Sequence, residues 1–348
     1  MSKKASKKAR QMVTLIITVI SLVCAVLFIP WEAVSLRLTP LSTSIEEELV
    51  LGTEYGIDGL MVYVDQAGEE AVYTAGWKDR DLRIPADADG YFKIASISKL
   101  YIAVVTTKLI DEKILSLDAT LDELLPDISS RIEYSDQVTL KLLLQHRSGI
   151  MDFIDHPDFP WENPPTTNEE SLEFILDSKG DFQPDKKYSY SNTNYLLIGA
   201  ILDDVLGYSH HQFILDEILE PHGLDHTFNL MADVDINDMI SGYYVGYDQD
   251  IKYNDFIMPG GSMVATIQDV GRFLRLLNNG DLFTSSQQEI YSSVYEYEHT
   301  GELPGYLSIA RYHKDTDTVI ILFANTSGSD SWSKVTKVYD RVRKIANQ

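Results

Sequence analysis

The chain contains a single cysteine, Cys24, among its 348 residues. One cysteine excludes an intramolecular disulfide and a zinc site built from several thiolates. The sequence also lacks an H-E-x-x-H pattern, a G-x-S-x-G turn and a glycine-rich phosphate-binding loop. Its nearest approach to a metal cluster is a group of histidines that we interpret as surface residues: His210, His211, His222 and His226. The sequence therefore predicts neither a metal site nor a cofactor.

Positive charge is scarce in this chain. Lys and Arg number 29 against 53 Asp and Glu, which gives a formal net charge of -24. Positive charges gather in the first eleven residues, where no acidic residue occurs, so the rest of the chain is more acidic still. An acidic surface repels the phosphates of nucleic acids and of anionic lipids. We therefore expect no nucleic acid partner.

The N-terminal residues form a separate element. Residues 1–11 are a short basic tail, and residues 12–31 are an uncharged apolar run until Trp31. About 20 apolar residues suffice to span a bilayer, and a basic flank favours the cytoplasmic side. The pattern predicts a single-pass signal-anchor with a cytoplasmic N-terminus and an extracytoplasmic domain at the cell membrane. A cleaved signal peptide is the alternative, although no A-x-A-like site follows the run.

One large domain is predicted over residues 45–348, after a linker at residues 32–44. Alternating apolar residues predict strands near both ends of this domain, and the region between about 110 and 250 is largely helical with loops. This order predicts an α+β fold, with an antiparallel sheet flanked by helices and an inserted helical subdomain. The cleft between sheet and helices is the expected site. The specific elements expected are a helix from Ile45 to Tyr55 capped by Ser44 and Glu47, strands at 59–64, 71–77, 242–247 and 307–324, and a helix at 329–346.

The first chemical motif is Ser96-Ile97-Ser98-Lys99. An apolar run follows it and predicts a buried helix with Ser96 in its first turn. Residues three apart are neighbours on a helix, so Lys99 would lie beside the Ser96 hydroxyl. Burial lowers the pKa of a lysine, which prepares the amine to accept a proton. The alternative is a capped core helix with a surface lysine, and a second S-x-x-K pattern at residues 331–334 shows how easily it arises by chance.

The second motif is Tyr190-Ser191-Asn192, in a loop that precedes another apolar helix. Loop residues held between packed elements often carry catalytic side chains. Tyr190 is predicted to handle protons, with its pKa lowered if a charged Lys99 lies nearby. The amide of Asn192 both donates and accepts hydrogen bonds, which suits a substrate amide. The alternative is an inward-packed aromatic residue with Asn192 as a helix cap.

The third motif is His299-Thr300-Gly301, followed by Glu302. It precedes two predicted strands, so we expect it to form a strand edge beside Ser96. Gly301 permits close backbone approach, and His299 and Thr300 are candidates to bind a substrate carboxylate or to pass protons. The backbone N–H of Glu302 is a candidate to form an oxyanion hole with that of Ser96. The alternative is a hairpin with a surface histidine.

The three motifs in this order resemble the penicillin-recognising serine hydrolases, which include DD-peptidases, serine beta-lactamases and related esterases. The likeness is to the class C-like branch and covers roughly residues 45–345. It extends to the segments at 138–150, 218–224 and 259–273. The resemblance implies that Ser96 is acylated, that Lys99 and Tyr190 manage its proton, and that Asn192 and residues 299–301 line the cleft.

The resemblance implies a small peptide, beta-lactam or ester as substrate, and we expect a D-alanyl peptide or related amide rather than a simple ester. Two residues depart from the family pattern. Asp185 replaces a usual glycine in a turn, and Glu302 stands where relatives that bind a carboxylate keep a small or hydroxylated residue. An acidic side chain in the cleft would repel a substrate carboxylate. An esterase and a non-catalytic penicillin-binding or sensory module on the same fold are the remaining alternatives.

Overall fold

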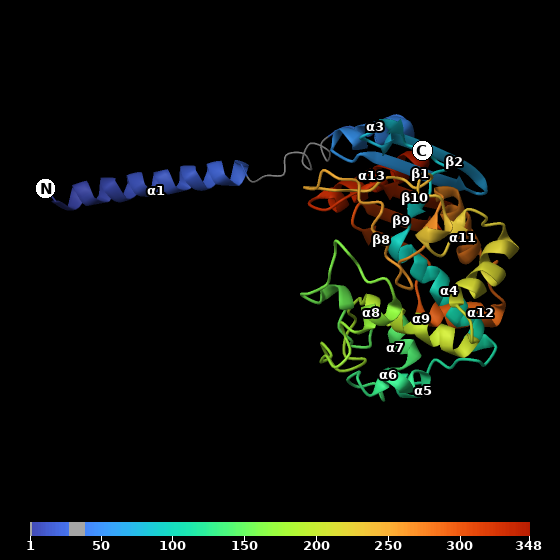
Figure 1. Cartoon of the computed structure of the whole chain (residues 1–348). Coiled ribbons are helices and arrows are strands. Elements are labelled where there is room, and N and C mark those ends of the chain that lie inside the picture. Colours follow the sequence, from blue (N-terminus) through green and yellow to red (C-terminus); the bar gives the residue numbers. More distant parts are fainter. Residues whose placement is uncertain (1, 28–38) are drawn as a thin grey trace. The chain divides into compact units, whose positions relative to one another are not determined.

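The computed structural model describes residues 2–27 and 39–348, and it divides into two units at residues 1–41 and 42–348 (Figure 1). The first unit contains helix α1 (Ser2–Leu27). Within the described residues, no helix has both the length and the apolar character needed to cross a membrane. The predicted transmembrane span at 12–31 is therefore not supported, and its residues 28–31 lie outside the described residues, as does most of the predicted linker.

An antiparallel sheet forms one side of the second unit, as predicted for an α+β fold. Its strand order is β3-β2-β1-β10-β9-β8, so strands from the two ends of the domain pair at its centre. The predicted hairpin forms from β1 and β2, and the predicted pair after residue 306 forms β9 and β10. The strands are β1 (Gly59–Gln66), β2 (Glu69–Asp79), β3 (Ile84–Pro85), β8 (His299–Leu303), β9 (Tyr306–His313) and β10 (Thr318–Ala324).

Alternation along the central strands buries both faces of this sheet. On β1, Leu60 and Val62 pack with helices α3 (Ile45–Glu54) and α13 (Ser331–Ala346), whereas Met61 and Tyr63 face the core that contains helix α11 (Ile267–Asn279). Successive side chains of a strand point to opposite faces, which explains the two cores. The sheet is thereby fixed between helical layers, and its edge strand β8 is held in place for the site.

The cap of α3 differs in one detail from the sequence prediction. Ser44 accepts a hydrogen bond from the Glu47 N–H at 3.3 Å, as expected of an N-cap. The Glu47 carboxylate, however, accepts from the N–H and the hydroxyl of Thr43 at 3.0 and 2.7 Å rather than from Ser44. A second donor on the Thr43 side chain gives the carboxylate two bonds there, which explains why the full capping box does not form.

The segment between the sheet strands is largely helical, as predicted (Figure 1). The strand predicted at 242–247 shortens to β6 (Tyr243–Tyr244), which pairs in parallel with β11 (Thr326–Ser327), and a small sheet joins β4 (Phe92–Lys93), β7 (Val264–Ala265) and β5 (Thr227–Phe228). The remaining helices are α4 (Ser98–Asp111), α5 (Leu121–Leu124), α6 (Pro126–Ser129), α7 (Leu140–Leu144), α8 (Asn168–Leu172), α9 (Asn192–Leu206), α10 (His210–Ile214) and α12 (Ser285–Val294), with short helical turns η1 (Ala95–Ile97), η2 (Phe153–Asp155), η3 (Leu215–Leu219), η4 (Glu220–His222) and η5 (Met231–Asp233).

The interpretation of the histidine group as surface residues is wrong for His210. Its side chain is buried, and its Nδ1 lies 2.7 Å from a carboxylate oxygen of Asp203. Among the residues that the structure describes, no three His, Cys, Asp or Glu side chains gather closely enough to hold a metal ion.

Candidate active site

Ser96 lies in the short helical turn η1, immediately before the buried helix α4. The sequence predicted it inside the first turn of that helix. The difference arises at Ala95, whose φ of 52° lies in the left-handed region that L-residues rarely adopt. The Ser98 hydroxyl donates to the Ala95 carbonyl at 2.6 Å and helps to hold this turn. Ser96 is thereby placed on the wall of the cleft.

The amine of Lys99 is fully buried beside Ser96. Its Nζ lies 3.0 Å from Ser96 Oγ, 2.8 Å from Asn192 Oδ1 and 2.9 Å from the carbonyl oxygen of Gly260. Burial lowers the pKa of Lys99 to about 7, and the negative charge of Asp152 opposes part of this shift. The alternative of a surface lysine is therefore wrong, and the amine has the neutral form available near neutral pH.

Gly260 lets a backbone carbonyl reach this amine. Its φ is +77°, and a Cβ at this position would lie 2.7 Å from Lys99 Cγ. Both the conformation and the close approach require glycine. The carbonyl supplies Lys99 with an acceptor from a segment 161 residues away along the chain.

Tyr190 completes the group around the serine. Its hydroxyl donates to Ser96 Oγ at 2.7 Å. Burial raises the pKa of Tyr190 above its usual value, whereas we expected a charged Lys99 to lower it. The expectation is wrong because the same burial lowers the pKa of Lys99, so the amine does not supply a full charge that favours the phenolate. Tyr190 is therefore a phenol at neutral pH.

His146 holds the loop that carries Tyr190. Its carbonyl accepts the Ser189 N–H at 2.9 Å, and its Nδ1 accepts the Ser191 N–H at 3.2 Å, one residue on either side of Tyr190. Its ring stacks on the Tyr190 ring with centroids 4.4 Å apart. Burial lowers the pKa of His146 to about 3, so the imidazole is neutral and can accept that N–H. The motif resemblance included this residue, but its contact with Tyr190 was not predicted.

Asn192 begins helix α9 and bridges Lys99 to a buried acid. Ser191 occupies the N-cap position, so the alternative of Asn192 as the cap is wrong. The backbone N–H and the side-chain Nδ2 of Asn192 both donate to the same oxygen of Asp152, each at 2.9 Å. Asp152 was not predicted from the sequence. It orients Asn192 so that Oδ1 faces the lysine.

Replacing Asp152 tests this orientation. The change Asp152→Ala leaves two buried N–H donors of Asn192 without their acceptor, and such groups cost ~1–3 kcal/mol each. We expect the free energy of unfolding to fall by at least this amount in denaturant titrations. The control is Asp155→Ala, because Asp155 is an exposed carboxylate on the same turn. Equal free energies of unfolding for the two variants would show that the contact between Asp152 and Asn192 does not stabilise the fold.

The third motif forms the edge strand β8, as predicted, and it lies against the serine turn. A Cβ on Gly301 would fall 2.4 Å from the carbonyl oxygen of Ile94, so only glycine permits this approach. His299 is desolvated, which lowers its pKa to about 4, and its Nδ1 contacts the carbonyl of Thr300. The alternative of an exposed surface histidine is wrong, because His299 is a neutral group on the cleft wall.

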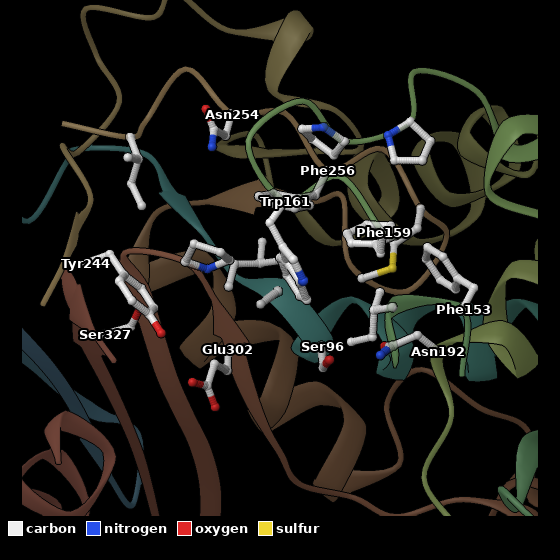
Figure 2. Close-up of a pocket in the computed structure, with 18 of the residues that line it drawn as sticks. Ser96, Phe153, Phe159, Trp161, Asn192, Tyr244, Asn254, Phe256, Glu302 and Ser327 are labelled. Carbon is white, nitrogen blue, oxygen red and sulfur yellow. The ribbon is translucent and has the colours of Figure 1, made fainter. Parts of the chain in front are cut away.

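A cleft of about 1190 Å³ opens above these groups (Figure 2). Ser96, Tyr190 and Asn192 line it from the helical side, and His299, Thr300 and Glu302 line it from β8. Lys99 lies beneath it. An aromatic wall that the sequence did not predict faces this group: Phe153, Phe159, Trp161 and Phe256. The cleft therefore joins a polar reacting centre to an apolar surface.

Comparison with known sequences places the chain in a family. Residues 45–295, more than half of the chain, match the beta-lactamase family. The chain belongs to the beta-lactamase family. The resemblance to penicillin-recognising serine hydrolases is thus confirmed, and so is the predicted family fold.

The relatives of this beta-lactamase-family chain are distant. It is 23% identical over 261 residues to a penicillin-binding protein of Bacillus subtilis (strain 168), and 25% identical over 262 residues to protein flp of Staphylococcus aureus (strain MW2). These matches cover 69% and 73% of this chain but 56% and 52% of the relatives. The chain therefore spans about half the length of the curated relatives it matches.

Solved structures share the beta-lactamase-family fold. D-amino acid amidase from Ochrobactrum anthropi SV3 superposes with a TM-score of 0.77 at 22% identity, over 89% of this chain and 99% of that chain. A class C beta-lactamase superposes with a TM-score of 0.69 at 18% identity, over 86% and 97% of the two chains. Identities this low show the fold alone.

The beta-lactamase-family domain brings all the predicted site residues to one place. Three motifs separated by about 90 to 110 residues meet at the Ser96 hydroxyl and the adjoining edge strand. Their catalytic and binding roles stay predictions. The residues that sequence reasoning missed are Asp152, Gly260 and the aromatic wall. The glycine was visible only as part of the family segment at 259–273, and the others carry no motif.

Proposed function

We propose that this protein hydrolyses small amide or ester donors through an acyl-enzyme formed on Ser96. The observation that carries the proposal is the convergence of Lys99 Nζ and the Tyr190 hydroxyl on Ser96 Oγ, at 3.0 and 2.7 Å. A serine hydroxyl is a weak nucleophile and needs an adjacent base. Lys99, with its pKa lowered to about 7, supplies that base near neutral pH.

The hydrogen-bond partners of Lys99 fit this role. A neutral amine has two N–H donors and one lone pair. Asn192 Oδ1 and the Gly260 carbonyl accept the two N–H groups, which leaves the lone pair for the proton of Ser96. As Ser96 Oγ attacks the carbonyl carbon, its proton passes to Lys99. Tyr190 is a phenol at the start of this step and donates its proton to the leaving group. The Lys99 ammonium then returns a proton to Tyr190, so both groups recover their starting forms.

The negative oxygen that forms on the substrate needs donors. We propose that the backbone N–H groups of Ser96 and Glu302 supply them. What supports this pairing is the contact between β8 and the serine turn, which Gly301 makes possible. Deacylation repeats the same steps with water as the nucleophile, and Lys99 and Tyr190 again exchange its proton.

The site geometry supports the acyl-enzyme mechanism more directly than it supports any one substrate. The family includes penicillin-binding proteins, and a D-amino acid amidase shares the fold, so amides of small peptides or amino acids are the first candidates. Glu302 in the cleft disfavours donors with a free carboxylate, including D-alanyl peptides and beta-lactams. Neutral esters are therefore a second candidate class, and the cleft's aromatic wall suits their apolar groups.

Covalent labels test the proposal. A neutral fluorophosphonate should label the purified protein at Ser96, seen by intact mass and by peptide mapping. Labelling by a fluorescent penicillin as well would place beta-lactams among the donors, and labelling by the phosphonate alone would favour amides and esters without a carboxylate. If neither probe labels the protein, a non-catalytic binding module would be left as the function.

We also propose that the hydrolase domain is located outside the cytoplasm. Sequence features support this location: the basic residues 1–11 precede the apolar residues 12–31, an order typical of signal-anchors and signal peptides. The high density of acidic residues beyond this segment is compatible with an exterior location.

Fractionation tests the location. In spheroplasts, external protease should remove the domain while a cytoplasmic marker survives. An anchored form should stay with membranes after a carbonate wash, and a soluble form that begins near residue 30, roughly the end of the apolar run, would show a cleaved signal peptide instead. Protection of the domain together with the cytoplasmic marker would contradict the proposal.

A further inference from the structure

The carboxylate of Glu302 stands beside the reacting centre on the edge strand β8. Thr300 and Glu302 line the cleft, whereas Gly301 between them packs against the serine turn. This alternation follows from the pleat of the strand, which points every second side chain to the same face. In the view of Figure 2, Glu302 lies on the cleft wall between Ser96 and Tyr244. Ser96 and Glu302 therefore line the same cleft.

No hydrogen bond or ion pair joins the Glu302 side chain to another residue within the described part of the chain. Asp152, by contrast, already accepts two hydrogen bonds from Asn192. Desolvation raises the pKa of Glu302 above its usual value. The Glu302 side chain is exposed in the cleft, so its carboxylate is accessible to a cation of the donor and can form a charge-assisted hydrogen bond with it.

The cleft has few positively charged groups that could bind a substrate anion. Its acidic lining residues are Asp152, Asp155, Glu162 and Glu302, and no lysine or arginine lines it among the residues that the structure describes. His299 is neutral because its pKa is about 4, and the Lys99 amine is buried beneath the cleft, where Ser96, Asn192 and Gly260 already contact it. A substrate carboxylate would meet like charge, whereas an ammonium group would meet Glu302.

We propose that Glu302 binds a positively charged amine of the donor and thereby selects cationic substrates over neutral ones and excludes carboxylates. The apolar wall of Phe153, Phe159, Trp161 and Phe256 receives an aromatic or aliphatic group of the same donor. The inference rests on the proposed acyl-enzyme function and specifies its substrate class: amides or esters that carry a free amine near the scissile carbonyl.

Protection of Ser96 from a neutral fluorophosphonate measures this selection directly. The competitors are phenethylamine, phenethyl alcohol and phenylacetate, which share a ring and differ in charge. In the unmodified protein, we expect phenethylamine to protect Ser96 at ~10–100-fold lower concentration than the alcohol, because a hydrogen bond between charged groups contributes to binding by this factor. Phenylacetate should protect least.

Variants assign the preference to Glu302. The change Glu302→Gln keeps the shape of the side chain and removes its charge, so phenethylamine should lose its advantage over phenethyl alcohol as a protector of Ser96. Glu302→Lys should reverse the order and favour phenylacetate. The control is Glu298→Gln, an equal change of charge next to the same strand at a side chain that pairs with Arg311 outside the cleft lining. It should leave the amine preference intact.

The outcomes separate this inference from the function on which it rests. Labelling of Ser96 with no amine preference, or with a preference that survives in Glu302→Gln, would overturn the role of Glu302 and leave the acyl-enzyme proposal in place. A protein that no fluorophosphonate labels would overturn both. Loss of the preference in Glu302→Gln and not in Glu298→Gln would support the inference.

Discussion

The variant Ser96→Ala should lose turnover and covalent labelling altogether while it keeps its fold. We expect a fall of ~10³-fold or more in kcat/KM, because removal of a nucleophile from a coupled catalytic group leaves only binding and electrostatic effects. Stability should change little, since Ser96 is only partly buried and its two partners lose one hydrogen bond each. Ester hydrolysis, fluorophosphonate labelling and thermal unfolding measured on one preparation check both parts.

The chain provides its own control for this variant. Ser331 and Lys334 repeat the S-x-x-K spacing at the start of α13, where Lys334 lies 3.1 Å from Asp330. Ser331 is buried and is not among the cleft-lining residues. Ser331→Ala should therefore keep full activity. Normal hydrolysis by Ser96→Ala together with an inactive Ser331→Ala would overturn the assignment of the nucleophile.

The sequence was sufficient to find Ser96 and Lys99 because a short-range rule relates them, whereas Tyr190 was found through the order of the three motifs. The three-residue spacing puts Lys99 beside Ser96, although Ser96 itself lies in the turn before the helix. The buried helix after Lys99 followed from its apolar run, and the edge strand was expected because the third motif precedes two predicted strands.

The supporting contacts could not be predicted because they join residues far apart in the chain. Asp152 is 40 residues from Asn192, and the Gly260 carbonyl is 161 residues from Lys99. No local pattern indicates which acid or which carbonyl arrives at a given side chain. The same limit applies to the pKa of Tyr190, whose direction depends on how far the tertiary fold desolvates Lys99 and the phenol.

The pH dependence of acylation should identify the base. Because the pKa of Lys99 is lowered to about 7, its neutral form increases as the pH rises through that value. The rate of fluorophosphonate labelling should rise about tenfold per pH unit below 7 and level off above it, since each unit changes the neutral fraction by that factor. The rate should not fall again near the usual pKa of a phenol, because desolvation holds the pKa of Tyr190 above that value.

Two variants and their combination then separate the roles of the groups at Ser96 Oγ. Lys99→Ala should slow acylation by ~10²–10⁴-fold and abolish the rise of the labelling rate below pH 7, because it removes the base. Tyr190→Phe should slow both acylation and deacylation by a factor in the same range. The rise of the labelling rate below pH 7 should remain, since Lys99 still titrates. Stopped-flow labelling and steady-state hydrolysis across pH 5–9 measure both effects, and thermal unfolding controls for a loss of fold.

The double variant Lys99→Ala/Tyr190→Phe decides whether the pair acts as one unit. Both groups contact the same oxygen, and the proton that Tyr190 gives to the leaving group is replaced from Lys99. Once one group is absent, the other has no proton partner, so the double loss should be far smaller than the product of the single losses. Strictly multiplicative losses would mean independent roles. A fully active Tyr190→Phe would reduce Tyr190 to a ring that packs on His146 and would leave Lys99 as the sole acid–base group.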